Sequence, residues 1–183
     1  MGWRAWAVVE NRRQLRLRSV VFDTVWPPQD ELVAGCNRLS IRLWLPFLRR
    51  RATAHDVPFE RCSCGIHATS DVETAANYLY LYDDLRQPQL RCRAIGRVSL
   101  WGSVVEGESG WRASRAYPER LFLPRTDRAG RATDAEAILD GLSDYGVPIE
   151  ILEDEAEGAL ASAVRRVKQD RRRRRQRPTK AGS

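Results

Sequence analysis

Two segments near the start of the chain carry the pattern of a β-hairpin. Residues 3–9 are almost wholly apolar, and residues 15–22 begin with leucines that alternate with arginines. A period of two is typical of a strand with one buried face. The polar stretch between the segments predicts a turn. Pro27 and Pro28 end the second strand, because proline cannot donate a backbone hydrogen bond to a sheet.

The strongest strand pattern covers residues 92–105, and it predicts a second hairpin. The glycine-rich stretch 106–110 supplies the turn, and the chain returns from Trp111 to Tyr117. We expect Gly110 to adopt a positive φ in this turn, which glycine does at little cost. A further short extended piece lies between Tyr117 and Pro124.

Apolar residues at helical spacing predict a helix from about Asp71 to Leu85, with Ser70 as its N-cap. Its expected inner stripe consists of Ala75, Tyr78, Leu79 and Tyr82. A second helix is predicted from Thr133 or Asp134 to about Tyr145, and 147–152 reads as a short edge strand. An alanine-rich helix is expected from Glu155 to about Gln169.

Strands and helices in this order, without βαβ alternation, indicate the α+β class. We expect a small curved antiparallel sheet or a partly open barrel with two to three helices. Residues 1–133 would form a β-rich core domain with one helix, and 134–168 an acidic helix-strand-helix extension packed on it. Residues 169–183 would be a disordered Arg-rich tail, because a run of like charges repels itself and buries nothing.

The net charge of +7 on 183 residues is unevenly distributed. Residues 134–164 hold nine acids and no base, whereas 165–183 hold ten bases and one acid. Contact of the tail with nucleic-acid phosphates is one reading of this layout, and the residues concerned are Arg171, Arg172, Arg173, Arg174 and Arg175. The other reading is a solvated tail that folds back on the acidic block.

Cys62-Ser63-Cys64-Gly65 is the sharpest short motif, since two thiols in a turn can face one ion. Zinc requires four nitrogen or sulfur ligands, and the most economical set is Cys36, His55, Cys62 and Cys64. His67 is the alternative nitrogen ligand or a neighbour of the site. Other readings are plain reduced thiols, a redox CxC pair, or a nucleophilic Cys64 with a histidine base.

Six tryptophans are many for this length, and most fit a sheet core. Trp101 and Trp111 are expected to face each other across the glycine-rich turn. A planar ligand would stack on this pair, with arginines beside it that we expect to be Arg97, Arg112 or Arg115.

Several motifs resemble those of a loosely defined group of actinobacterial proteins without a known activity. They are Gly2-Trp3-Arg4-Ala5-Trp6, Thr24-Val25-Trp26-Pro27-Pro28, His55 with Cys62-Ser63-Cys64-Gly65-Ile66-His67-Ala68, Gly96-Arg97-Val98 with Leu100-Trp101-Gly102, Gly110-Trp111-Arg112-Ala113, and Ala116-Tyr117-Pro118. The resemblance implies one fold over residues 2–124. It implies no activity, cofactor or partner.

Signatures of common enzyme classes are not found in the chain, which has neither a P-loop nor an HExxH or GxSxG motif. We expect a cytoplasmic protein, because no export or membrane-spanning segment is evident. The first hypothesis is a non-enzymatic binding module that contacts nucleic acid through an Arg/Trp surface and the tail. The alternatives are a zinc-stabilised adaptor that binds protein through residues 134–157, and a small Cys/His enzyme.

Overall fold

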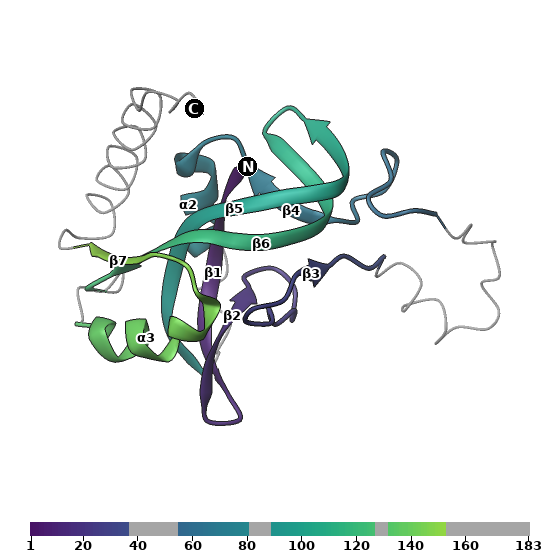
Figure 1. Cartoon of the computed structure of the whole chain (residues 1–183). Helices are drawn as coiled ribbons and strands as arrows, with labels where there is room; N and C mark the ends of the chain where they lie inside the picture. The colour runs from purple at the N-terminus through teal and green to yellow at the C-terminus, as the bar shows by residue number, and fades with distance from the viewer. Residues whose placement is uncertain (37–54, 81–88, 127–131, 153–183) are drawn as a thin grey trace, which may run out of the picture.

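The computed structural model describes residues 1–36, 55–80, 89–126 and 132–152. Within them, seven strands form one sheet, and two α-helices and a 3-10 helix pack on it (Figure 1). The elements are β1 (Gly2–Asn11), β2 (Gln14–Ser19), β3 (Leu32–Val33), β4 (Ile66–Thr69), α2 (Val72–Tyr80), β5 (Leu90–Gly107), β6 (Gly110–Pro124), α3 (Ala135–Gly141), η1 (Ser143–Tyr145) and β7 (Ile149–Leu152). The α+β class is confirmed. None of the helices in these ranges is long and apolar enough to cross a membrane.

The sheet closes on itself. β1 pairs with both β4 and β5, and β6 pairs with the same two strands, so four strands form a hydrogen-bonded ring. β2, β3 and β7 branch from this ring as edge strands. The expected partly open barrel is therefore present. β7 departs from the antiparallel expectation: it runs parallel to β6, because the chain returns through α3 instead of a tight turn.

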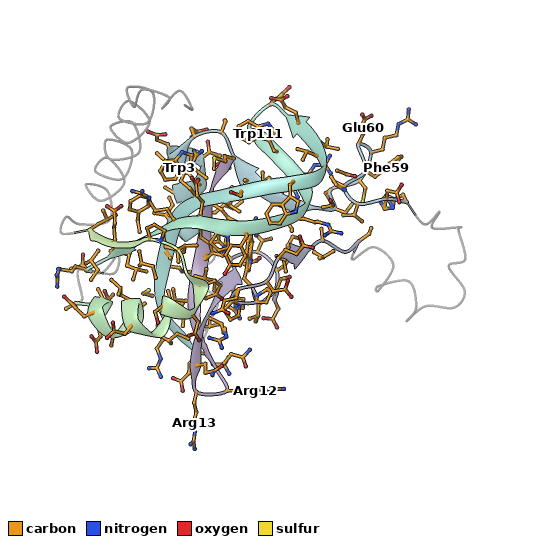
Figure 2. All side chains as sticks on the ribbon, viewed as in Figure 1. Trp3, Arg12, Arg13, Phe59, Glu60 and Trp111 are labelled. Carbon is orange, nitrogen blue, oxygen red and sulfur yellow. The ribbon has the colours of Figure 1, made fainter. Side chains whose placement is uncertain are left out.

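Both predicted hairpins are confirmed by the register. β1 and β2 join through Arg12 and Arg13, which have φ of 51° and 66° and lie at the tip of the hairpin (Figure 2). β5 and β6 join through a turn between Gly107 and Gly110. Gly110 has a φ of 151°, as expected. The return strand and the further extended piece form a single strand, β6, and a shift of register beside Pro118 accommodates the proline.

One face of every ring strand points into a common core. Trp6 of β1, Ala68 of β4, Val98 of β5 and Leu121 of β6 are all buried in one cluster. The helical segment after β6 completes this cluster with Ile138, Leu142 and Tyr145. The described part of the acidic segment thus packs into the same core as β1.

The outer face of the ring is covered by α2, and here the sequence predictions need two corrections. Val72, Ala75 and Ala76 pack against Trp3 and its neighbours, whereas Tyr78 is 40% exposed. Asp71 is the N-cap instead of Ser70, since its Oδ1 accepts the Thr74 N–H at 2.7 Å. A carboxylate binds this orphan N–H better than a hydroxyl, and these bonds hold the pKa of Asp71 below its usual value.

The second predicted helix begins as expected, with Asp134 accepting the N–H of Ala137 at 3.3 Å. It is interrupted near Leu142 and continues only as the 3-10 turn η1, which ends at Gly146 with a φ of 64°. The end of the first predicted helix, the last predicted helix and the tail of Arg171 to Arg175 lie outside the described residues.

Candidate metal centre

The four predicted metal ligands come together in the fold. The ligand atoms of Cys36, His55, Cys62 and Cys64 all lie within 4.8 Å of one another. Cys36 Sγ is 3.9 Å from Cys62 Sγ, and Cys64 Sγ is 3.5 Å from His55 Nε2. The sulfur atoms of Cys36 and Cys62 are too far apart for a disulfide, and no disulfide forms among the described residues. This cluster could hold a metal ion.

The approach of Cys36 to Cys62 follows from two short strands on β6. β3 pairs with Ala116 and Arg115, and β4 pairs with the residues from Ala113 to Gly110. Both strands are antiparallel to β6, so they lie in line along its edge, with β3 ending where β4 begins. Cys36 follows β3 and the CxC motif precedes β4. The sheet therefore brings their side chains to one point.

Gly65 shapes the turn that aims the CxC motif. Its φ is 114°, and a Cβ atom here would lie 2.9 Å from Pro58 Cβ and 3.2 Å from Arg112 Cβ. His55 packs edge-on against Phe59, with ring centroids 5.0 Å apart. The Nδ1 of His55 is buried and has no hydrogen-bond partner within the described part of the chain. Within the described residues, the packing on Phe59 and the contact of Nε2 with Cys64 therefore orient the imidazole.

Arg112 organises the cysteine loop, which the sequence did not indicate. Its guanidinium donates to the carbonyl oxygen of Cys62, to that of Cys64 at 3.1 Å and to that of Phe59 at 3.3 Å. Figure 2 shows Phe59 and Glu60 on this loop, to one side of the sheet. Arginine suits the role because its planar fork presents several donors at fixed angles. Arg112 thus holds the backbone of the cysteine loop through its carbonyl groups, and the thiol groups of the loop lie near one another.

The thiols lie in surroundings that disfavour a lone thiolate. Burial raises the pKa of Cys64, and the neighbouring Cys62 and Cys36 raise it further. Several thiolates can share such a space only if a cation compensates their charge. Cys92 is apart from this group: it is buried in the ring core, and burial raises its pKa to about 12.

His67 is a neighbour of the cluster and not one of its members. Its Nε2 lies 2.9 Å from the carbonyl oxygen of Ser63. Burial lowers the pKa of His67, and the nearby guanidinium groups of Arg4 and Arg112 lower it further. Of the two nitrogen ligands considered from sequence, the structure brings His55 to the thiols.

The expected pairing of Trp101 with Trp111 is wrong. The β5–β6 turn lies directly before Trp111, so this residue pairs with Glu106, while Trp101 pairs with Arg115. Of the arginines expected beside the tryptophans, Arg115 lies opposite Trp101 and Arg112 follows Trp111, whereas Arg97 lies elsewhere. Arg97 is only 6% exposed and lies over the Trp3 ring, with its Nε 3.8 Å from Glu119. Arg115 forms an ion pair with Glu31.

Comparisons of the chain with models of protein families, with curated proteins and with solved structures find no match. The interpretation of the site therefore depends on its residues and their geometry.

Proposed function

We propose that this chain is a zinc-stabilised binding domain, in which Cys36, His55, Cys62 and Cys64 hold one structural zinc ion. The observation that carries the proposal is the convergence of the four ligand atoms. In a tetrahedral site, bond lengths of about 2.3 Å to sulfur and 2.0 Å to nitrogen put two sulfurs about 3.8 Å apart and sulfur and nitrogen about 3.5 Å apart. The separations of 3.9 Å and 3.5 Å agree with this geometry, and the other pairs, which lie within 4.8 Å, would draw closer around an ion.

The ligand set favours zinc in a structural role. Three thiolates and an imidazole are soft ligands that suit zinc and do not suit magnesium or calcium. Four protein ligands fill a tetrahedron and leave no position for a substrate or water, which is the arrangement of structural sites. The thiol–imidazole contact of Cys64 and His55 would equally fit a nucleophilic pair, but that reading leaves Cys36 and Cys62 unexplained.

The zinc would fix three parts of the chain to β6. It would connect the end of β3, the beginning of β4 and His55, which follows the segment 37–54. Cross-links that close long loops reduce the entropy of the unfolded chain, and metal binding to such a site contributes directly to folding. We expect the metal to stabilise the strand arrangement that shapes the surface around the CxC motif.

The two contact surfaces expected from the sequence, the Arg/Trp surface and the acidic segment 134–157, are weak candidates for the surface that binds a partner. Arg97 and Arg115 are neutralised by Glu119 and Glu31, which weakens the case for an Arg/Trp surface that attracts phosphates. In the acidic segment, Glu136 and Glu150 form ion pairs with Arg125 and Arg120, at 2.8 Å and 2.7 Å. These acids bind the chain's own sheet, and the binding surface is better sought elsewhere.

The proposal is tested by the metal content of protein purified without a His-tag. We expect about one zinc per chain, and loss of most of it in Cys62→Ser and Cys64→Ser. Cys92→Ser is the matched control, because Cys92 lies outside the cluster and its variant should keep the metal. A folded wild-type protein without metal, which also takes up none from added zinc, would overturn the proposal.

A further inference from the structure

A cavity of about 480 Å³ lies beside the cysteine loop, and neither the core nor the metal site accounts for it. Its walls come from β1, the end of β5, the beginning of β6, β4, α2 and the loop after β2. The residues that matter most here are Trp3, Arg4, Phe22, Tyr78, Trp111 and Arg112. This volume is in the range of sites that bind small molecules.

The cavity is built around a repeated tetrapeptide. Gly-Trp-Arg-Ala occurs at residues 2–5 in β1 and again at 110–113 in β6. β4 runs between the two copies, with Thr69 paired to Trp3 and Ala68 paired to Trp111. Figure 2 shows Trp3 and Trp111 at the same end of the sheet. The fold thus places two Trp-Arg pairs along one cavity.

The cavity wall is positively charged. Among the described residues that line it are Arg4 and Arg112, and none of these lining residues is an aspartate or glutamate. Within the described residues, Arg4 donates to the His67 carbonyl oxygen and, at 2.9 Å, to Ser19 Oγ, and its buried Nε has no partner. The Arg112 guanidinium donates to backbone carbonyls of the cysteine loop. Neither of these arginines has a carboxylate partner in the described ranges, so an anionic ligand could compensate their charges there.

Large apolar side chains form the rim. Phe22 is 51% exposed and Tyr78 is 40% exposed, and both line the cavity. Exposed aromatic residues beside a hollow are typical of a ligand site, because they offer flat surfaces for stacking. Arg4 and Phe22 also line a smaller cavity of about 270 Å³ that reaches Cys36 and Cys62. The ligand space and the cysteine cluster are therefore adjacent.

We propose that this cavity binds a small planar aromatic anion, with its ring among the rim aromatics and its carboxylate or phosphate group at Arg4 and Arg112. The inference deepens the binding function proposed above. Guanidinium groups bind both anions through paired hydrogen bonds, and an anion supplies the charge that the cavity wall lacks. Discrimination should come from the negative charge, because the stacking surfaces accept any flat ring.

The test is isothermal titration of the full-length protein with two anionic probes, indole-3-acetate and adenosine 5′-monophosphate. Indole-3-acetamide and adenosine are the matched neutral probes. We expect at least one anion to bind, and its neutral analogue to bind at least about tenfold more weakly. Binding of indole-3-acetate alone would indicate a carboxylate ligand, and binding of the nucleotide alone a phosphate ligand.

Variants localise the binding. Arg4→Met should weaken it at least about tenfold, and Tyr78→Ala should weaken it several-fold while leaving the fold intact, because Tyr78 lies on the rim. Trp101→Ala is the matched control, since Trp101 is exposed on β5 and does not line the cavity. Equal effects of Tyr78→Ala and Trp101→Ala would overturn the proposed place of binding.

Absence of binding of both anions to a folded, zinc-loaded protein would overturn the inference while leaving the metal proposal in place. Binding of an anion to a folded protein that holds no zinc would support the ligand cavity and overturn the proposed metal centre. Equal binding of the neutral and anionic probes would overturn the role of the arginines. Zinc content measured on the same samples distinguishes these cases.

Discussion

Arg112 and Cys62 are 50 residues apart in the sequence, yet the Arg112 guanidinium donates to the Cys62 carbonyl oxygen. The same guanidinium reaches the carbonyl oxygen of Cys64 at 3.1 Å. β6 thus determines the shape of the loop that carries the CxC motif. Residues that orient metal ligands from outside the coordination shell often contribute strongly to metal affinity. Arg112 is such a residue, because it holds the backbone of Cys62 and Cys64.

Arg112→Lys should loosen this loop, because lysine keeps the positive charge but cannot reach several carbonyls at once. We expect a loss of about 2 kcal/mol in the free energy of unfolding and a tenfold to hundredfold loss in zinc affinity, on the order seen for other outer partners of metal ligands. Urea unfolding and competition with a chromophoric chelator measure the two effects.

Arg115→Lys is the matched control. Arg115 lies on the same strand but makes an exposed ion pair with Glu31, and such pairs contribute less than about 1 kcal/mol. If both variants retain zinc equally well, Arg112 does not support the metal centre.

Gly110→Ala should destabilise the β5–β6 turn. The φ of 151° is unfavourable for alanine, and the added Cβ would lie 2.1 Å from the Ala68 carbonyl oxygen. We expect a cost of about 1–3 kcal/mol in the free energy of unfolding, measured by urea denaturation. Gly107→Ala in the same turn should be nearly silent, because its Cβ would meet only the Gly110 oxygen at 3.8 Å. Equal effects of the two substitutions would contradict the turn geometry.

Tyr145 connects α3 and η1 to the hairpin core, and it should make stability depend on alkaline pH. Its hydroxyl donates to the Trp26 carbonyl at 2.7 Å and accepts the Leu17 N–H at 2.9 Å. Burial raises the pKa of Tyr145 from 10.0 to about 12. The folded state therefore favours the protonated phenol, so this contribution is complete below about pH 10 and is lost as the pH rises towards 12.

Tyr145→Phe should cost about 1–3 kcal/mol at neutral pH, because it leaves the buried Leu17 N–H and Trp26 carbonyl without this partner. The difference in the free energy of unfolding between the two proteins should shrink at about pH 11. At this pH the phenol ionises in the unfolded wild-type chain, which lowers the stability of the wild type. Urea unfolding of both proteins across this range measures it. A difference that stays constant from neutral to alkaline pH would rule out this role for Tyr145.

Local patterns were sufficient to predict the two hairpins. The alternation in residues 15–19 and the turn at Gly110 are properties of neighbouring residues, and the register confirms both. Local patterns could not predict that the ring closes, because β4 has only four residues and pairs with β1 and β6, which are distant in the sequence. A short strand of this kind has too little periodicity to identify its partners.

The sequence predicted the ligands of the candidate metal site, but it did not predict the residue that holds the cysteine loop in place. Thiol and imidazole chemistry selected Cys36, His55, Cys62 and Cys64, and the fold brings them together. The role of Arg112 depends on the register of β4 against β6, which the sequence does not reveal. The repeated Gly-Trp-Arg-Ala tetrapeptide was the available signal for the cavity, but its meaning depends on β4 running between the two copies.

X-ray absorption at the zinc edge on the untagged, full-length protein tests the central claim most directly. If Cys36, His55, Cys62 and Cys64 hold the ion, the spectrum will show three sulfur ligands at about 2.3 Å and one nitrogen ligand at about 2.0 Å. Cys36→Ser should reduce the count to two sulfurs, and Cys92→Ser should leave it at three. A first shell of oxygen and nitrogen atoms, or a sulfur count that Cys36→Ser does not change, would contradict the proposed metal centre.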